Sequence, residues 1–394
     1  MPDSNLLEVK DLSVHFHSRR GTVHAVDNVS FDIKPGETLA LVGETGCGKS
    51  VTARSILKLV PEPPGDYASG SITLSEDGKP SIDMLSAPIQ DVRAVRGERI
   101  SMIFQDPGKA LNPALTIGRQ VSEVFGEHRL DMILESAGID PAKASRLEIR
   151  VAQQRASLLQ LRVFELTRKK KAKALQKSID DAVAKALAET GIPNPRKIMN
   201  SYPHELSGGM KQRVMIAQAL ACNPDLLIAD EPTTALDVTI QARILELIQE
   251  MQRRRGMAVL YITHDLSLVR EFADRVAVMY AGRIVEIGPA LEVLAAPKHP
   301  YTQGLLGAIP HRRTARGQLA AIPGSVPQLV SPPAQCHFAS RCKWAAPACS
   351  AVVPSLNLVE KNRQVACLRF ESAGDVAVDA ADMPVSAELQ EETA

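Results

Sequence analysis

The chain has 394 residues, 45% hydrophobic and 23% charged, as expected for a soluble globular protein of about two or three domains. A net charge of +1 gives no overall field that would indicate nucleic-acid binding. There is no apolar run of about 18 or more residues, and residues 1–10 lack the features of a secretory signal, so we expect a cytoplasmic chain.

The N-terminal region, residues 6–42, consists of alternating and apolar runs that predict an antiparallel β layer leading into a parallel core. Phe16 lies at the end of one of these strands, where an aromatic ring can stack on adenine. A simple core position for Phe16 is an equal alternative, and His15 or His24 is an alternative stacking residue.

Residues 43–50 read GETGCGKS and lie between an apolar strand at 38–42 and a helix at 51–57, which predicts a P-loop. Glycines allow successive amides to turn around a phosphate, and the helix start adds partial positive charge. We expect Lys49 to reach the β- and γ-phosphates and the Ser50 hydroxyl to bind Mg²⁺. The predicted ATP contacts here are Gly43, Glu44, Thr45, Gly46, Cys47, Gly48, Lys49, Ser50 and Val51.

A buried strand is predicted at 99–105 and ends in the amide of Gln105. Residues 121–190 are rich in strong helix formers and predict a helical hairpin. The basic run at 168–173 lies within this helical stretch. It is either a solvated helix face or a surface for anionic lipid headgroups.

Two later buried strands also end in polar residues, namely 224–231 in Asp230 and Glu231 and 256–265 in His264. Ligands of α/β sheets bind beyond the carboxyl ends of parallel strands, so these side chains and Gln105 should converge beside the P-loop. Asp230 suits the Mg²⁺ shell, and Glu231 suits a general base acting on the attacking water. Gln105 suits Mg²⁺ or that water, and His264 suits the γ-phosphate. Taken singly, each is better explained as a solvent-facing strand end, but together with a P-loop this alternative becomes weak.

Residues 206–210 read LSGGM and precede an apolar helix, so their exposed amides form a second site suited to phosphate. A hairpin is predicted over 276–287, with its turn at 281–282. Beyond Pro297 the chain is rich in proline and is expected to be irregular, and residues 371–394 are acidic and expected to be disordered.

The order of the P-loop, Gln105, residues 206–210, residues 230–231, Ala235-Leu236-Asp237 and His264 resembles the ATP-binding-cassette (ABC) ATPases over about residues 5–295. The resemblance implies an α/β P-loop fold with a RecA-like parallel core, an antiparallel β layer and a helical subdomain at about 107–222. The basic helical stretch at about 145–185 is an insertion of no established role.

Three longer segments resemble the subfamily of oligopeptide, dipeptide and nickel importers. They are residues 202–217, residues 229–241 and the run HPYTQGLL at 299–306. The last of these lies in a C-terminal region, residues 296–370, that is typical of this subfamily. Met210 stands where most cassettes have Gln, as is usual in the subfamily.

The resemblance also implies how such a chain works. Two cassettes enclose two ATP molecules, each held between one P-loop and the partner's signature sequence, so Ser207, Gly208, Gly209 and Asp237 would act in trans. The implied partners are a second, different ATPase subunit, two membrane permeases and an extracytoplasmic peptide-binding protein. The resemblance implies that the chain is located at the cytoplasmic face of the inner membrane, and it implies ATP and Mg²⁺ as cofactors.

Four of the six cysteines, Cys336, Cys342, Cys349 and Cys367, are crowded together in the C-terminal region. In a reducing compartment such a group suggests a metal site more than disulfides. Some subfamily members carry a similar region that binds an iron–sulfur cluster, which makes a 4Fe-4S cluster the expected occupant. Structural zinc and four unpaired thiols are the alternatives.

The sequence therefore predicts the ATP-hydrolysing subunit of an importer of di- or oligopeptides. An importer of another small solute such as nickel, a soluble ABC ATPase that acts on nucleic acid or ribosomes, and a metal-sensing interaction protein built around the cysteines are the alternatives.

Overall fold

The computed structural model describes residues 5–76, 79–156, 158–234, 236–308, 322–327 and 329–371. Ala235 and, apart from Glu371, the predicted acidic tail lie outside the described residues. The chain divides into two compact units, one formed by Met1–Ala87 with Leu260–Ala394 and the other by Pro88–Val259. Each unit is described by itself.

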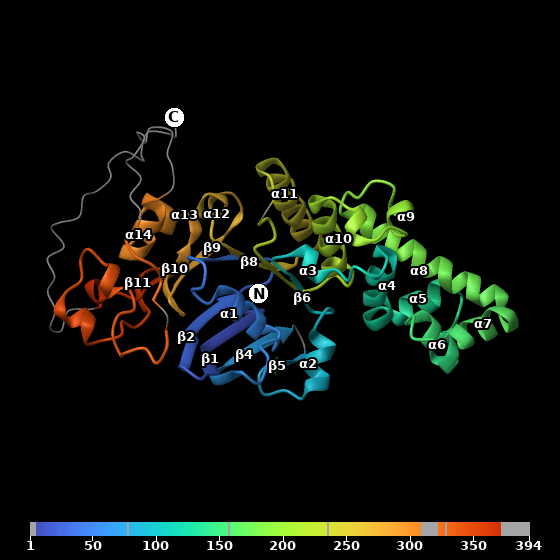
Figure 1. Ribbon diagram of the computed structural model, residues 1–394, viewed down its shortest axis with the longest axis horizontal. Coiled ribbons are helices and arrows are strands. Elements are labelled where there is room, and N and C mark those ends of the chain that lie inside the picture. Colours follow the sequence, from blue (N-terminus) through green and yellow to red (C-terminus); the bar gives the residue numbers. More distant parts are fainter. Residues whose placement is uncertain are drawn as a thin grey trace. The chain divides into compact units, whose positions relative to one another are not determined.

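The first unit contains the predicted antiparallel layer, drawn in blue in Figure 1. Its strands are β1 (Leu7–Ser18), β2 (Gly21–Ile33), β4 (Gly65–Glu76) and β5 (Lys79–Asp83). They follow the order β2-β1-β4-β5, and every pairing is antiparallel. Leu7, Val9 and Leu12 on β1 are buried, which is how an apolar run anchors one face of a sheet.

A second sheet supplies the core of the same unit. Its strands there are β3 (Thr38–Val42), the end of β8 (Ala258–Thr263), β9 (Arg275–Tyr280) and β10 (Arg283–Pro289). β3 pairs in parallel with β9, and β9 pairs with β10 as the predicted antiparallel hairpin. Its turn needs left-handed backbone at Ala281 (φ 46°) and Gly282 (φ 80°), which suits the glycine. The helices here are α1 (Lys49–Ile56), α12 (Leu266–Phe272) and α13 (Ala290–Ala295).

The C-terminal region is more regular than its proline content predicts, and in this respect the expectation of an irregular chain beyond Pro297 is wrong. Helix α14 (Pro300–Gly307) begins with its proline in the first turn, where a missing N–H costs nothing. Strands β11 (Asn357–Glu360) and β12 (Arg363–Val365) extend the core sheet, because β12 pairs with β10.

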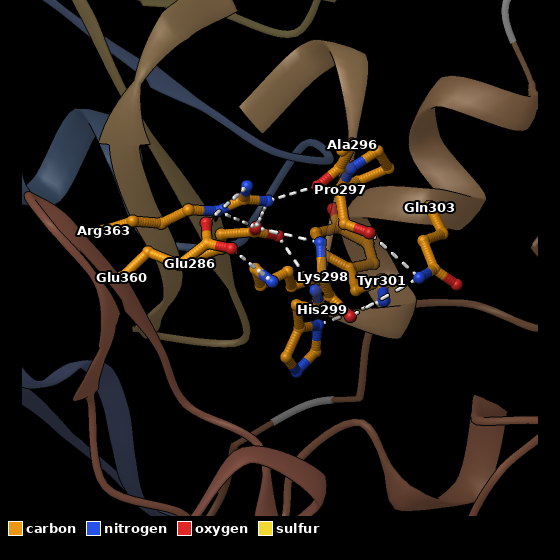
Figure 2. Close-up of polar contacts among 9 residues, drawn as sticks. All are labelled: Glu286, Ala296, Pro297, Lys298, His299, Tyr301, Gln303, Glu360 and Arg363. Atoms are coloured by element: carbon orange, nitrogen blue, oxygen red, sulfur yellow. Dashed lines mark hydrogen bonds and ion pairs between the residues drawn. The ribbon is translucent and has the colours of Figure 1, made fainter. Parts of the chain in front are cut away.

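One buried ion pair ties this added hairpin to the sheet, as Figure 2 shows. Glu286 on β10 is fully buried, and Arg363 on β12 is 2% exposed, with 2.6 Å from Nη2 to Oε1. The Glu286 carboxylate also accepts hydrogen bonds from the amides of Lys298 and His299, both at 3.0 Å. Such additional bonds are what make a buried charge pair tolerable.

The second unit combines two parallel strands with helices. Strand β6 (Ile100–Ile103) runs parallel to β7 (Leu226–Asp230), and both are mostly buried. The helices are α2 (Ile89–Val95), α3 (Pro107–Ala110), α4 (Ile117–His128), α5 (Leu130–Ser136), α6 (Arg146–Ala152), α7 (Leu158–Thr167), α8 (Lys169–Glu189), α9 (Pro195–Ile198), α10 (Gly208–Leu220) and α11 (Val238–Arg255). The predicted helical stretch is thus several helices, of which α8 packs against α4, α5 and α10.

The predicted basic insertion is organised around a buried carboxylate. Glu148 is 1% exposed and forms ion pairs with Arg168 at 2.9 Å and with Lys171 at 2.7 Å. It also closes a capping box with Ser145 at the start of α6. Two cations of the basic run therefore bind α6 to the start of α8. Among the described helices, none combines the length and the apolar character needed to cross a membrane.

Candidate nucleotide-binding site

The predicted P-loop joins β3 to α1 in the first unit, and two of its glycines are required by close approach. A Cβ on Gly43 would lie 2.1 Å from the carbonyl oxygen of Met279, and one on Gly48 would lie 2.4 Å from that of Ala25. Gly48 also has φ 108°, a conformation that other residues resist. The loop is thus pressed between β2 and the end of β9, where only glycine fits.

Lys49 begins α1 and turns back across the loop. Its side chain is almost wholly buried, and Nζ donates to the carbonyl oxygens of Gly43 at 2.7 Å and Glu44 at 3.0 Å. The amide of Gly282 donates to the carbonyl oxygen of Cys47 at 2.9 Å and fixes the loop from the β9–β10 turn. Burial raises the pKa of the Cys47 thiol, so this cysteine is not an activated nucleophile.

Other predicted residues of the first unit lie at strand ends. Phe16 is half-buried near the end of β1. His15 and His24 stack with their ring centroids 4.0 Å apart, and burial lowers the pKa of His15. The choice of adenine-stacking residue therefore stays open among these three. His264 directly follows β8 and is exposed.

In the second unit the structure brings Gln105 and Glu231 together. Gln105 Nε2 donates to Glu231 Oε2 at 3.0 Å, and the Thr234 hydroxyl donates to the same oxygen at 2.9 Å. Asp230 ends β7 and is 1% exposed, while Glu231 is 9% exposed with φ 45°. A left-handed glutamate directly after a buried strand is strained, which is common at functional positions.

The predicted trans-acting residues form two adjacent helix starts in the second unit. Ser207 caps α10 by accepting from the amide of Met210 at 3.4 Å, and Asp237 caps α11 by accepting from that of Ile240 at 2.9 Å. A Cβ on Gly209 would lie 3.2 Å from Ile240, so the two starts touch. Ser207 and Asp237 are exposed, which leaves both starts open to a ligand or partner.

The predicted ATP and Mg²⁺ residues are thus divided between the units. The P-loop, Phe16 and His264 belong to the first unit, and Gln105, Asp230, Glu231, Ser207, Gly208, Gly209 and Asp237 belong to the second. Their roles stay predictions.

Sequence reasoning missed three contacts. Thr234 supports Glu231, and Tyr301 and Arg341 both hold Glu44 of the P-loop. Thr234 and Tyr301 lie in segments that carried the subfamily resemblance, whereas nothing in the sequence around Arg341 singles it out.

The four C-terminal cysteines line one cavity together with Phe338, Trp344 and other residues. Burial raises the pKa of the thiols of Cys336, Cys342 and Cys367, the last to about 11. Among the described residues, no three His, Cys, Asp or Glu side chains are grouped so that they could hold a metal ion. The described structure therefore contains no formed metal-ligand group, although the four thiols share one apolar cavity.

Comparison with known proteins gives two family matches and several close relatives. The family described as ABC transporter matches residues 26–234, and the oligopeptide/dipeptide transporter C-terminal region matches residues 285–349. A putative peptide import ATP-binding protein of Brucella ovis is 43% identical, over 93% of this chain and 97% of its own. The dipeptide transport ATP-binding protein DppD of Bacillus subtilis is 41% identical, over 96% and 98%.

Solved structures agree on the fold. The structure of cbiO1 from Clostridium perfringens, part of an ABC transporter complex, aligns with a TM-score of 0.51 at 28% identity, over 74% of this chain and 91% of that one. A dimeric ATP-binding cassette bound to ADP and phosphate aligns with a TM-score of 0.50 at 22% identity, over 72% and 98%.

Proposed function

This chain belongs to the ABC transporter family, and from that premise we propose that it is the ATP-hydrolysing subunit of an importer of di- or oligopeptides. The observation that carries the proposal is the joining, in one chain, of a cassette with the oligopeptide/dipeptide transporter C-terminal region. The relatives named for peptide import and dipeptide transport align with this chain over nearly their whole length.

In this proposal each predicted residue has a separate task. Lys49 and the loop amides bind the phosphates, and Ser50, Gln105 and Asp230 hold the Mg²⁺ ion. The ion, when bound, neutralises charge on the phosphate oxygens. Glu231 accepts the proton of the attacking water, and Gln105, bonded to Glu231, orients both. His264 would donate to the γ-phosphate.

The same proposal covers partners and organisation. Ser207, Gly208, Gly209 and Asp237 complete the ATP site of a second, different cassette, and the pair drives two permeases supplied by an external peptide-binding protein. The chain would bind peripherally at the inner face of the membrane through those permeases. Residues 5–295 would form the cassette and residues 296–370 the C-terminal region.

For the four cysteines we propose a metal centre, with an iron–sulfur cluster ahead of zinc. Their shared cavity is the support, since four thiols could turn inward as ligands. Anaerobic purification followed by visible absorption, iron and sulfide analysis tests it. A colourless protein without iron, sulfide or zinc would contradict it.

Uptake by intact cells tests the main proposal. A strain lacking this chain should lose uptake of labelled di- and oligopeptides, and the wild-type chain should restore it, whereas Lys49→Ala should not. Nickel uptake measured in the same strains separates the alternative. Loss of nickel uptake with peptide uptake intact would overturn the peptide assignment.

A further inference from the structure

The P-loop residue Glu44 forms an ion pair with a side chain from the C-terminal region. Arg341 Nη1 lies 2.8 Å from Glu44 Oε2, and Nη2 lies 3.1 Å from Oε1. This is the two-pronged arrangement in which arginine binds a carboxylate most strongly and with a fixed orientation. The Arg341 side chain is 5% exposed and the Glu44 side chain 30%, so the cation is largely shielded from solvent while the carboxylate is partly exposed.

Arg341 is itself held rigidly. Nε donates to the carbonyl oxygen of Pro323 at 2.8 Å, and Nη2 donates to that of Gly324 at 3.2 Å. The guanidinium also lies over the ring of Tyr280, 5.7 Å from its centroid. These contacts fix the cation before it meets Glu44.

A second contact from the C-terminal region holds the backbone of the same residue. The amide of Glu44 donates to the hydroxyl of Tyr301 on α14 at 2.9 Å. Phe338 packs against the rings of Tyr280 and Tyr301, with centroids 5.1 Å and 5.5 Å away, and so joins both anchors. The carboxylate and the amide of Glu44 are thus both held from residues beyond the matched cassette segment.

The charge of Glu44 is a difficulty for a loop that binds a polyanion. Its backbone carbonyl oxygen lies 3.0 Å from Lys49 Nζ, the amine expected to reach the phosphates. An unpaired carboxylate on this same loop residue would repel a triphosphate bound at Lys49. Arg341 neutralises that charge and, through its two contacts, fixes the orientation of the Glu44 carboxylate.

We propose that Arg341 is a positioning residue for ATP, which makes the C-terminal region part of the nucleotide site by neutralising and orienting Glu44. The inference rests on the proposed ATP-binding role of the P-loop.

Binding of a fluorescent ATP analogue to the full-length chain tests the proposal with a double-mutant cycle that removes the two charges. Arg341→Met should weaken binding roughly tenfold, because a half-exposed carboxylate then faces the phosphates. In the Arg341→Met, Glu44→Gln double variant, the affinity for the ATP analogue should return to within about twofold of wild type, because the Glu44 carboxylate that repels the phosphates is gone. In ATP hydrolysis the KM of Arg341→Met should rise while kcat stays near wild type.

Lys298→Met is the matched control. Lys298 pairs with Glu360 at 2.8 Å in the same C-terminal region rather than with Glu44, so its loss should leave ATP affinity unchanged. The defect of Arg341→Met should also shrink as salt rises, since salt screens the exposed carboxylate. Thermal unfolding of each variant shows whether it is folded, and Arg341→Gln, which also removes the charge, replaces Arg341→Met if the latter does not fold.

Two results would overturn the inference. One is an unchanged affinity in a folded Arg341 variant. The other is a loss that Glu44→Gln does not rescue, which would assign Arg341 to the fold alone. If instead the P-loop does not bind ATP, the result is distinguishable: the wild-type chain would not bind ATP, or the Lys49→Ala variant would bind it as well as wild type does.

Discussion

Glu231 is the residue at which binding and turnover should separate. Its carboxylate is nearly buried and accepts hydrogen bonds from Gln105 and Thr234, and its own backbone is in the strained left-handed conformation. Glu231→Gln keeps the shape and both hydrogen bonds but cannot accept a proton. We expect ATP hydrolysis to fall by about 10²–10⁴-fold with ATP affinity retained, measured by phosphate release and by equilibrium binding.

Glu250→Gln is the control for that prediction, because Glu250 lies in the same unit and pairs with the exposed Arg254 on its own helix. Its hydrolysis should match wild type. Near-normal turnover in Glu231→Gln would show that the general base lies elsewhere.

At the scale of elements, Glu148 joins α6 to the start of α8. Burial alone would raise its pKa, but hydrogen bonds from Lys171 and Ser145 outweigh burial and hold the pKa at about 2. Because the pKa of Glu148 is lower in the folded state than in the unfolded state, its ionised carboxylate stabilises the protein above about pH 4.5. This stabilisation should be lost as the pH falls toward about 2. Glu148→Gln should therefore cost about 1–3 kcal/mol of unfolding free energy at pH 7.

Urea unfolding measures that cost, and Glu135→Gln, an exposed carboxylate on α5, is the control. If Glu148→Gln unfolds at the same urea concentration as the control, the cations of the basic run do not stabilise this junction.

His299 gives the C-terminal region a different dependence on pH. It is buried, its Nδ1 accepts the amide of Tyr301 at 3.0 Å, and burial lowers its pKa to about 3. Below about pH 6.5 the imidazole of His299 is protonated in the unfolded chain but stays neutral in the folded chain. The free energy of unfolding should therefore fall by up to about 1.4 kcal/mol per pH unit as the pH decreases.

His299→Asn keeps an acceptor for the Tyr301 amide but cannot titrate. Unfolding measured from about pH 6.5 downward should lose most of its acid slope in this variant. Parallel slopes in the variant and wild type would show that another group is responsible.

At the scale of the whole molecule, the proposal requires two cassettes to close on ATP. Glu231→Gln, which should bind without hydrolysing, is expected to associate when ATP is added, either with itself or with its different partner subunit. Adding Ser207→Arg should block association, because a bulky cation replaces a small cap at the exposed start of α10. Light scattering with and without ATP measures this.

Lys49-dependent ATP binding should survive in the Ser207→Arg chain, since that residue lies in the other unit from the P-loop. Association that persists despite Ser207→Arg would contradict the trans role of the signature.

The sequence predicted the elements that rest on local pattern. The P-loop glycines, the β9–β10 turn and the apolar strands are all encoded by neighbours in the chain, and the structure confirms those elements. The β11–β12 hairpin was missed because its strands have four and three residues and depend on pairing with β10. Arg341 was also missed because its role depends on a partner that is distant in sequence, since Glu44 is 297 residues away.

The buried pair of Glu286 and Arg363 has a genetic consequence. A stop codon ahead of Arg363 spares every residue predicted to bind nucleotide, yet it strips a cation from a carboxylate sealed inside the sheet. Such late-truncated alleles should behave as complete loss-of-function mutations through degradation of the product, although sequence inspection would class them as nearly intact.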